Sequence, residues 1–270
     1  MRGVEYGQSA MNKAGLTAAP SLSVLPAGSA ILTLKFRLLS PLLTKDDDPF
    51  YLFDNPVRRD HIFGVPYLAA ASVKGLSVDA YQRGFIQSQD WSALGDEDAV
   101  RTRQFRIRDG HARRLFGLAD DGVQVESSQA GRLHFGPVWF PSVQYLVMNP
   151  MKGDGSGLGS LPIQFEAIAP LMADGKTPVE AELHVFYFNP AGAPESDTAT
   201  VRGDLARWLA AVAAWWPVMG LGAKRLAGYG AIEPVSAICQ ARDWPDSPGK
   251  QEFNGKDSWM KLAEFIAKGA

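Results

Sequence analysis

A glycine-rich stretch late in the chain, Met219–Gly230, has the residue types of an anion-binding loop. It holds four glycines, two adjacent cations and one aromatic residue: Gly220, Gly222, Lys224, Arg225, Gly228, Tyr229 and Gly230. Glycine allows positive φ, consecutive free N–H groups form anion-binding nests, and arginine offers a planar fork suited to phosphate. The stretch therefore predicts a clamp on a polyanion backbone. The alternative is a glycine-rich turn with two solvated charges, and the stretch lacks the Gly-Lys-Ser/Thr ending of a P-loop.

A second candidate for anion binding lies in the segment Gly64–Leu76. Apolar residues at helical spacing follow Ser72, which is a favourable N-cap residue. Lys74 and Gly75 are then expected in the first helical turn, where free N–H groups and the helix dipole favour an anion. Ordinary surface charge is the alternative for Lys74.

A third candidate is a group of arginines within residues 101–114. Its members are Arg101, Arg103, Arg106, Arg108, Arg113 and Arg114. Clustered arginines neutralise phosphates and so contribute strongly to nucleic-acid affinity. The pattern predicts contact with an RNA backbone, and a solvated basic face is the alternative.

One carboxylate is placed where it could assist phosphodiester cleavage. Asp54 lies in the long connection between Ser40 and Pro66, shortly before Arg58 and Arg59. Such a carboxylate could hold Mg²⁺ or orient a 2′-OH, while arginine charge offsets the developing anion. Alternatively, Asp54 only caps a turn.

Composition excludes several other classes of protein. The 270 residues are 46% hydrophobic with a net charge of −2, so any polyanion binding must come from local patches. No apolar run approaches the ~20 residues of a membrane helix. The single Cys239 excludes an internal disulfide framework and fits a cytoplasmic protein. The four histidines lack zinc-site spacing, and no Gly-x-Ser-x-Gly elbow is present.

Hydrophobic periodicity supplies the elements that must position these residues. It predicts a mobile arm over 1–29, a main domain over 30–240, and a loop with a short amphipathic helix over 241–270. Within the main domain we expect strands at 30–39, 131–140, 162–170, 179–188 and 231–238, with helices after Ser72 and over 201–216, and a loop over 140–159. This order predicts an α+β fold of two merged ferredoxin-like (RRM-like) halves, about 30–140 and 141–240, with antiparallel sheets and helices on one face.

Several of these motifs together resemble the RAMP superfamily, the repeat-associated proteins of CRISPR–Cas ribonucleoproteins. Gly64-x-Pro-Tyr…Ser72-x-Lys-Gly75 is similar to the motif that opens the first helix of the family and lies along the guide RNA. The order helix, glycine loop, strand at Met219–Gly230 resembles the C-terminal signature, and Leu115-Phe-Gly followed by Gly131-x-Leu-x-Phe resembles another. The resemblance spans residues 30–235. The chain departs from it with alanine at 69–71 and with Val78 and Asp79 where arginine is common.

The resemblance implies an RNA-binding subunit of a type III effector of the Csm or Cmr type, acting in antiviral defence. Its partners would be guide RNA, single-stranded target RNA and other Cas proteins, with no membrane. The segment Asp54-Asn-Pro-Val-Arg-Arg-Asp60 is similar to a loop of type III backbone subunits in which the equivalent of Asp54 is needed for target-RNA cleavage. This similarity implies endoribonuclease activity with Mg²⁺ or another divalent ion in the assembled complex, and no cofactor otherwise. The glycine loop instead resembles the non-catalytic capping subunit. A stand-alone guide-processing endoribonuclease using a histidine such as His61 is the remaining alternative.

Overall fold

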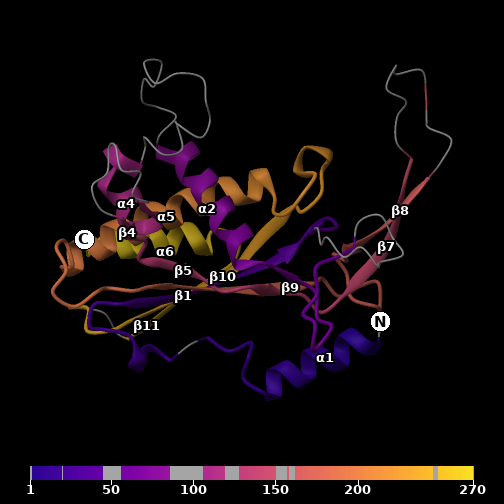
Figure 1. The fold of residues 1–270 in the computed structure, drawn as a ribbon, viewed down its shortest axis with the longest axis horizontal. Coiled ribbons are helices and arrows are strands. Elements are labelled where there is room, and N and C mark those ends of the chain that lie inside the picture. The colour runs from indigo at the N-terminus through magenta and orange to yellow at the C-terminus, as the bar shows by residue number, and fades with distance from the viewer. Residues whose placement is uncertain are drawn as a thin grey trace.

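The main body of the protein is one antiparallel sheet covered by helices on one face (Figure 1). The computed structural model describes residues 2–19, 21–44, 56–85, 106–118, 128–149, 157, 162–245 and 249–269. The sheet has five strands in the order β11-β10-β1-β9-β5. Their bounds are Ala30–Leu38 for β1, Leu133–Phe135 for β5, Glu180–Tyr187 for β9, Ile232–Ala241 for β10 and Lys250–Asn254 for β11.

The connections between these strands give a ferredoxin-like order. Helix α2 (Ala70–Phe85) lies between β1 and β5 in the chain, and α5 (Thr198–Met219) lies between β9 and β10. The elements β1-α2-β5-β9-α5-β10 therefore form one β-α-β-β-α-β unit. Strand β1 is central because it pairs with β10 on one side and with β9 on the other.

This topology corrects the expectation of two ferredoxin-like halves. The expected division near residue 140 puts β1 and β5 in one half and β9 and β10 in the other. These four strands alternate within a single sheet, so the division does not separate two sheets. The alternation in β1 predicts that one of its faces is buried, but it does not specify which strands pair with its two edges. Both neighbours, β9 and β10, come from later in the chain.

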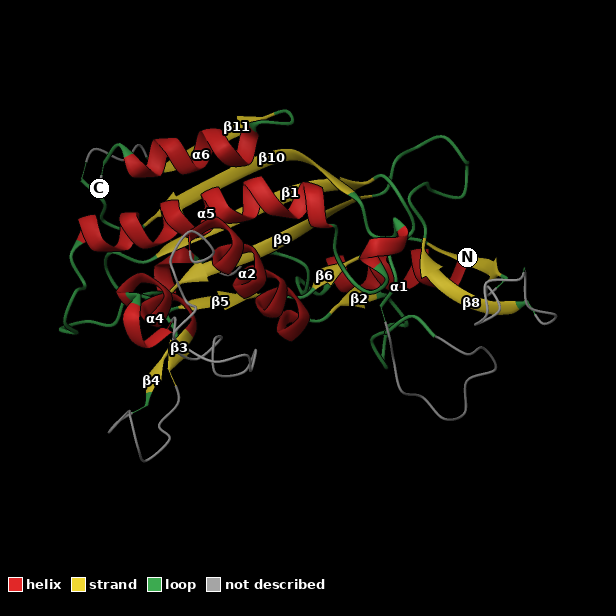
Figure 2. Cartoon of the chain, turned by 90° about the horizontal axis from the view of Figure 1, so that it is seen from above, coloured by secondary structure: helices red, strands yellow, loops and turns green. Residues whose placement is uncertain are grey.

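The helical layer and the core follow the predicted periodicity closely. Helices α4 (Gly110–Phe116) and α6 (Ser258–Ala267) lie with α2 and α5 above the sheet (Figure 2). The helical positions expected to be core are all buried: Val201, Leu205, Trp208, Leu209, Val212 and Trp216. Trp216 of α5 meets Trp259 of α6 at a centroid distance of 6.1 Å, which joins the C-terminal helix to the core.

Residues 2–19 and 21–28 lie along the opposite face of the sheet and contain a helix that the sequence did not predict (Figure 1). Helix α1 spans Arg2–Lys13 and the 3-10 helix η1 spans Leu22–Val24. A Cβ at Gly7 would lie 2.1 Å from the carbonyl oxygen of Phe63, so glycine permits α1 to approach that backbone closely. Glycine also lowers helix propensity, which explains why composition indicated a mobile arm instead.

Three small two-stranded sheets flank the main sheet. They are β2 (Tyr67–Leu68) with β6 (Val138–Trp139), β3 (Gly117–Leu118) with β4 (Gln129–Ala130), and β7 (Val143–Met148) with β8 (Ile163–Ile168). The β7–β8 hairpin projects from one end of the body (Figure 1). Strand β7 corrects the loop expected over 140–159, where Met, Gly and Pro obscured the alternation. No helix in the described ranges is long and apolar enough to span a membrane.

Candidate nucleic-acid interface

A cavity of about 260 Å³ brings together three of the segments singled out in the sequence. It lies where the glycine loop, the first turn of α2 and the segment after residue 55 meet. Its lining residues are Leu43, Thr44, Arg58, Tyr67, Leu68, Ala69, Ser72, Leu76, Gly222 and Ala223. Arg58, Ser72 and Gly222 are far apart in the chain, and each was a candidate RNA contact on separate grounds.

The glycine loop is held tightly against the segment that follows β1. Ala223 N donates to Leu43 O at 2.9 Å, and Gly230 N donates to Pro41 O at 2.8 Å. A Cβ at Gly222 would lie 2.4 Å from Leu43 O, and one at Gly230 would lie 1.9 Å from Leu221 O. Glycine is required at these two positions because the backbones are in contact and φ is positive.

The same hydrogen bonds limit the loop as an anion-binding nest. Between Gly220 and Gly230, the N–H groups of Gly220, Leu221, Ala223, Ala227, Gly228 and Gly230 donate to backbone carbonyls. These N–H groups are therefore not free for a phosphate. The positive charge of the loop comes from the two side chains at its turn.

Lys224 and Arg225 sit at that turn in different surroundings. Lys224 is exposed, adopts a left-handed backbone with φ 53°, and places Nζ 5.6 Å from the ring centroid of Phe165 in β8. Arg225 is half-buried, and its Nη1 lies 3.5 Å from Asp79 Oδ2. The carboxylate of Asp79 therefore offsets part of the charge of Arg225. Lys224 is the more available cation of the two.

The N-terminus of α2 differs from the sequence expectation by a few residues. Val73 N donates to Ala69 O at 3.0 Å, so the helix begins at Ala70 rather than after Ser72. Ser72 is therefore an exposed residue of the first turn and not the N-cap, and Lys74 and Gly75 lie just beyond that turn. Three consecutive alanines before Ser72 extend the helix backwards because alanine has the highest helix propensity.

The adjacent arginines 58 and 59 have separate roles. Arg58 lines the cavity, and its backbone N–H donates to Thr44 Oγ1 at 3.0 Å. Arg59 Nη2 instead lies 2.9 Å from Oε1 of Glu166, a fully buried carboxylate that also accepts from Val57 N. The guanidinium of Arg59 therefore neutralises a buried charge, which makes its role structural.

Lys74 and Arg106 form a second local concentration of positive charge. Burial, with the nearby charge of Arg106, lowers the pKa of Lys74. Burial also lowers the pKa of Arg106, which precedes α4, whereas Arg108 is exposed. Two cations at close range in partly buried positions raise the local positive potential, and a phosphate between them would relieve their repulsion.

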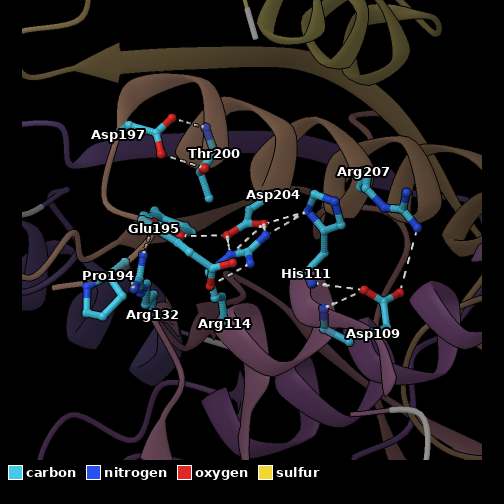
Figure 3. A network of polar contacts seen from close by, with 12 residues as sticks. Asp109, His111, Arg114, Arg132, Pro194, Glu195, Asp197, Thr200, Asp204 and Arg207 are labelled. Carbon is cyan, nitrogen blue, oxygen red and sulfur yellow. Dashed lines mark hydrogen bonds and ion pairs between the residues drawn. The ribbon is translucent and has the colours of Figure 1, made fainter. Parts of the chain in front are cut away.

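Arg114 is buried in an ion-pair network, so it fits neither the RNA-backbone contact predicted for the arginine group nor the alternative of a solvated basic face. It is 5% exposed, and its Nε and Nη2 both donate to the buried carboxylate of Asp204 in α5, at 2.9 and 2.7 Å (Figure 3). Asp204 also accepts from Tyr187 Oη and is paired with His111 Nδ1, each at 2.7 Å. Although burial opposes it, hydrogen bonds from His111, Arg114 and Tyr187 lower the pKa of Asp204. This network fastens α4 onto α5 and the sheet.

Other predicted site residues fall outside the described part of the chain. Asp54, Arg101 and Arg103 are among them. In the described ranges, no group of three or more His, Cys, Asp or Glu side chains could hold a metal ion. The divalent ion expected with Asp54 therefore stays a prediction.

An aromatic wall of the cavity was not among the predicted site residues. Tyr67 lines the cavity and packs on Trp139, with ring centroids 5.0 Å apart. Cross-strand pairing of β2 with β6 places the two rings together. Tyr67 belongs to the Gly64-x-Pro-Tyr motif, and its aromatic side chain was the sequence signal that could have identified it.

Comparison with known proteins places this geometry in context. The sequence model of the RAMP superfamily matches residues 35–233. No curated protein sequence matches the chain. Among solved structures, a chain of a type IV-B CRISPR complex is similar with a TM-score of 0.51 and 14% identity, over 80% of this chain and 93% of that chain. This likeness shows a shared fold.

Two further structures are similar at lower scores. A chain of the type III-B Cmr-beta complex bound to cognate target RNA gives a TM-score of 0.49 at 13% identity, over 84% of this chain. The present chain spans 63% of the length of that chain. A chain of the Csm3–Csm4 subcomplex of a type III-A CRISPR–Cas interference complex gives 0.46 at 14% identity, over 89% of this chain and 95% of that chain.

Proposed function

Because the chain belongs to the RAMP superfamily, we propose that it is an RNA-binding subunit of a CRISPR–Cas ribonucleoprotein effector. In this role the chain acts with other Cas proteins to hold the guide RNA and the target RNA that pairs with the guide. The cavity that joins Arg58, Ser72 and Gly222 is the observation that carries the proposal. Three sequence segments with separate reasons to contact RNA converge there.

The chemistry of the cavity suits an RNA backbone better than a small molecule. Arg58 supplies a guanidinium and Ser72 a hydroxyl, and both can donate to phosphate oxygens. Tyr67 supplies an aromatic wall against which a base or ribose can pack. Lys224, two residues after Gly222, adds an exposed positive charge to the same loop.

Local rather than overall charge supports this assignment. The net charge is −2, so nonspecific attraction of the whole chain to RNA is weak. Binding then depends on the cations beside the cavity and on the Lys74 and Arg106 pair. A subunit of this kind binds RNA along one defined path.

The subtype and a catalytic role are finer parts of the proposal. The motifs favour a type III effector complex, since the loop at Asp54 and the glycine loop both resemble loops of type III subunits. The loop at Asp54 favours a target-cleaving backbone subunit that uses a divalent ion. The glycine loop favours a non-catalytic cap.

A paired substitution tests the RNA-binding role. Replacing Lys224 and Arg225 with alanine should weaken RNA retention regardless of sequence, and lower the slope of log K against log salt by about one to two. The matched control replaces Lys250 and Lys261, two exposed cations in β11 and α6, and removes the same charge elsewhere. Equal salt slopes for both double variants would contradict the proposal.

A further inference from the structure

Three aromatic side chains form an exposed cluster on the sheet face opposite the helices. His134 of β5 stacks on Phe186 of β9, with ring centroids 5.3 Å apart and an interplanar angle of 11°. Phe188, just beyond β9, meets His134 edge-on at 6.4 Å. Phe188 is 38% exposed and His134 is exposed. We call His134, Phe186 and Phe188 the aromatic cluster.

Strand pairing fixes which face carries the cluster. His134 is the direct cross-strand partner of Phe186, so their side chains lie on the same face. The next residue, Phe135, packs against Trp208 of α5 on the helical face. Because side chains alternate along a strand, His134 points away from the helices.

The N-terminal segment covers only part of this face. Thr17 O lies 3.1 Å from Nε2 of His184, a β9 residue two positions before Phe186. Arg242 donates to the carbonyl of Ser23 at 3.0 Å on the side of β10. The aromatic cluster lies toward the other edge of the sheet, at β5, and keeps its exposure.

The charges near the cluster favour a polyanionic ligand with flat rings. Strand β5 is the edge of the sheet and α2 packs against it, so Lys74 of α2 acts on His134 around this edge. Partial burial, with the positive charge of Lys74, lowers the pKa of His134, which favours the neutral imidazole. A neutral imidazole beside phenylalanine rings stacks on a nucleobase, while Lys74 can neutralise the adjoining phosphate.

We propose that the aromatic cluster of His134, Phe186 and Phe188 is a stacking site for an unpaired base of single-stranded RNA. The inference rests on the proposed RNA-binding function and adds a second contact region to it. RRM domains, which have this ferredoxin-like topology, stack bases on aromatic side chains of the sheet face that their helices leave open. In this chain the N-terminal segment occupies part of that face, and stacking moves to the β5 edge.

Fluorescence of a 2-aminopurine-labelled single-stranded RNA 12-mer tests the site on the purified full chain. Stacking quenches this base, so wild type should quench it on binding. Phe188→Ala and His134→Ala should each lose quenching and weaken binding by about 5- to 150-fold per stacked base. Their salt slope should stay unchanged because no phosphate contact is removed. Phe188→Tyr should restore both signals, and a thermal melt of each variant checks the fold.

The outcomes separate this inference from the proposed function. If Phe188→Ala and His134→Ala bind and quench as wild type does, while the Lys224 and Arg225 double variant binds more weakly, the stacking site is refuted and RNA binding stands. That result would fit a patch that docks a protein instead. If the wild-type chain binds no single-stranded RNA, both proposals fail.

Discussion

Replacing Asp204 with alanine should destabilise the fold strongly without touching the candidate RNA contacts. Asp204 is fully buried, and its carboxylate accepts from Arg114 and contacts His111 (Figure 3). It also accepts a hydrogen bond from the hydroxyl of Tyr187. Removing the carboxylate leaves the Arg114 guanidinium buried, with the ion pair to the half-exposed Glu195 at 3.0 Å as weaker compensation. Breaking a buried pair by removing one partner costs about 3–5 kcal/mol.

The magnitude can be followed in a thermal or urea melt. For a domain of 150–250 residues, each kcal/mol lowers Tm by about 2–4 °C, so Asp204→Ala should lower Tm by roughly 6–20 °C. Asp197→Ala is the matched control, because Asp197 is the exposed N-cap of the same helix and its loss costs about 1 kcal/mol. A loss for Asp204→Ala no greater than that of the control would refute the reasoning.

A double-mutant cycle separates the pair from its surroundings. Arg114→Ala alone, Asp204→Ala alone and the two together give the coupling free energy, expected within the 0.5–3 kcal/mol seen for residues in one network. Coupling near zero would mean that burial of each residue, and not their contact, determines the stability.

Three further outcomes are expected. The pKa of the Asp204 carboxyl is lowered in the folded protein from its usual value of 3.8. The ionised carboxylate therefore stabilises the fold above pH 3.8, and this contribution is lost as the pH falls through the lower folded pKa. Asp204→Asn should flatten the acid limb of a plot of unfolding free energy against pH. Gly230→Ala should disrupt the glycine loop, since its Cβ would lie 1.9 Å from Leu221 O. Gly228 also has positive φ but has open space around it, so Gly228→Ala should cost only about 1 kcal/mol of stability. Equal losses of stability in the two variants would contradict this packing. Asp54→Ala in the reconstituted complex should abolish one cut of guide-matched RNA with binding unchanged, and an unaltered cut pattern would make the subunit a cap.

Local elements were predictable because periodicity reports burial directly. The alternation at 30–39 corresponds to β1 at Ala30–Leu38, and that at 179–188 corresponds to β9. The helical spacing over 201–216 gave the buried face of α5 correctly. Each of these patterns contains its own information about which side faces the core.

Long-range pairing was not predictable from the same patterns. Nothing in β1 specifies that β9 and β10 are its neighbours, and so the sheet was divided in two. Arg114 and Arg59 looked like surface cations because their buried partners, Asp204 and Glu166, lie 90 and 107 residues away. A buried ion pair is visible only when both partners are placed.

The candidate site was predicted in its parts but not in its assembly. The glycine loop and the segment around Ser72 were identified from residue types, and the structure joins them with Arg58 at one cavity. Tyr67 was missed because a single aromatic residue inside a short strand gives no periodic signal. The N-terminus of α2 was misplaced because Ser72 is a good N-cap in isolation, whereas the preceding alanines continue the helix.

Photo-crosslinking of RNA to the chain tests the central claim most directly. The complex is purified with its bound RNA carrying 4-thiouridine, irradiated and digested, and the crosslinked peptides are identified by mass spectrometry. The account predicts crosslinks in the peptides that line the cavity, around Arg58 and Tyr67, around Ser72 and around Gly222. Crosslinks confined to β11 and α6, or RNA that purifies with the complex but never crosslinks to these peptides, would contradict it.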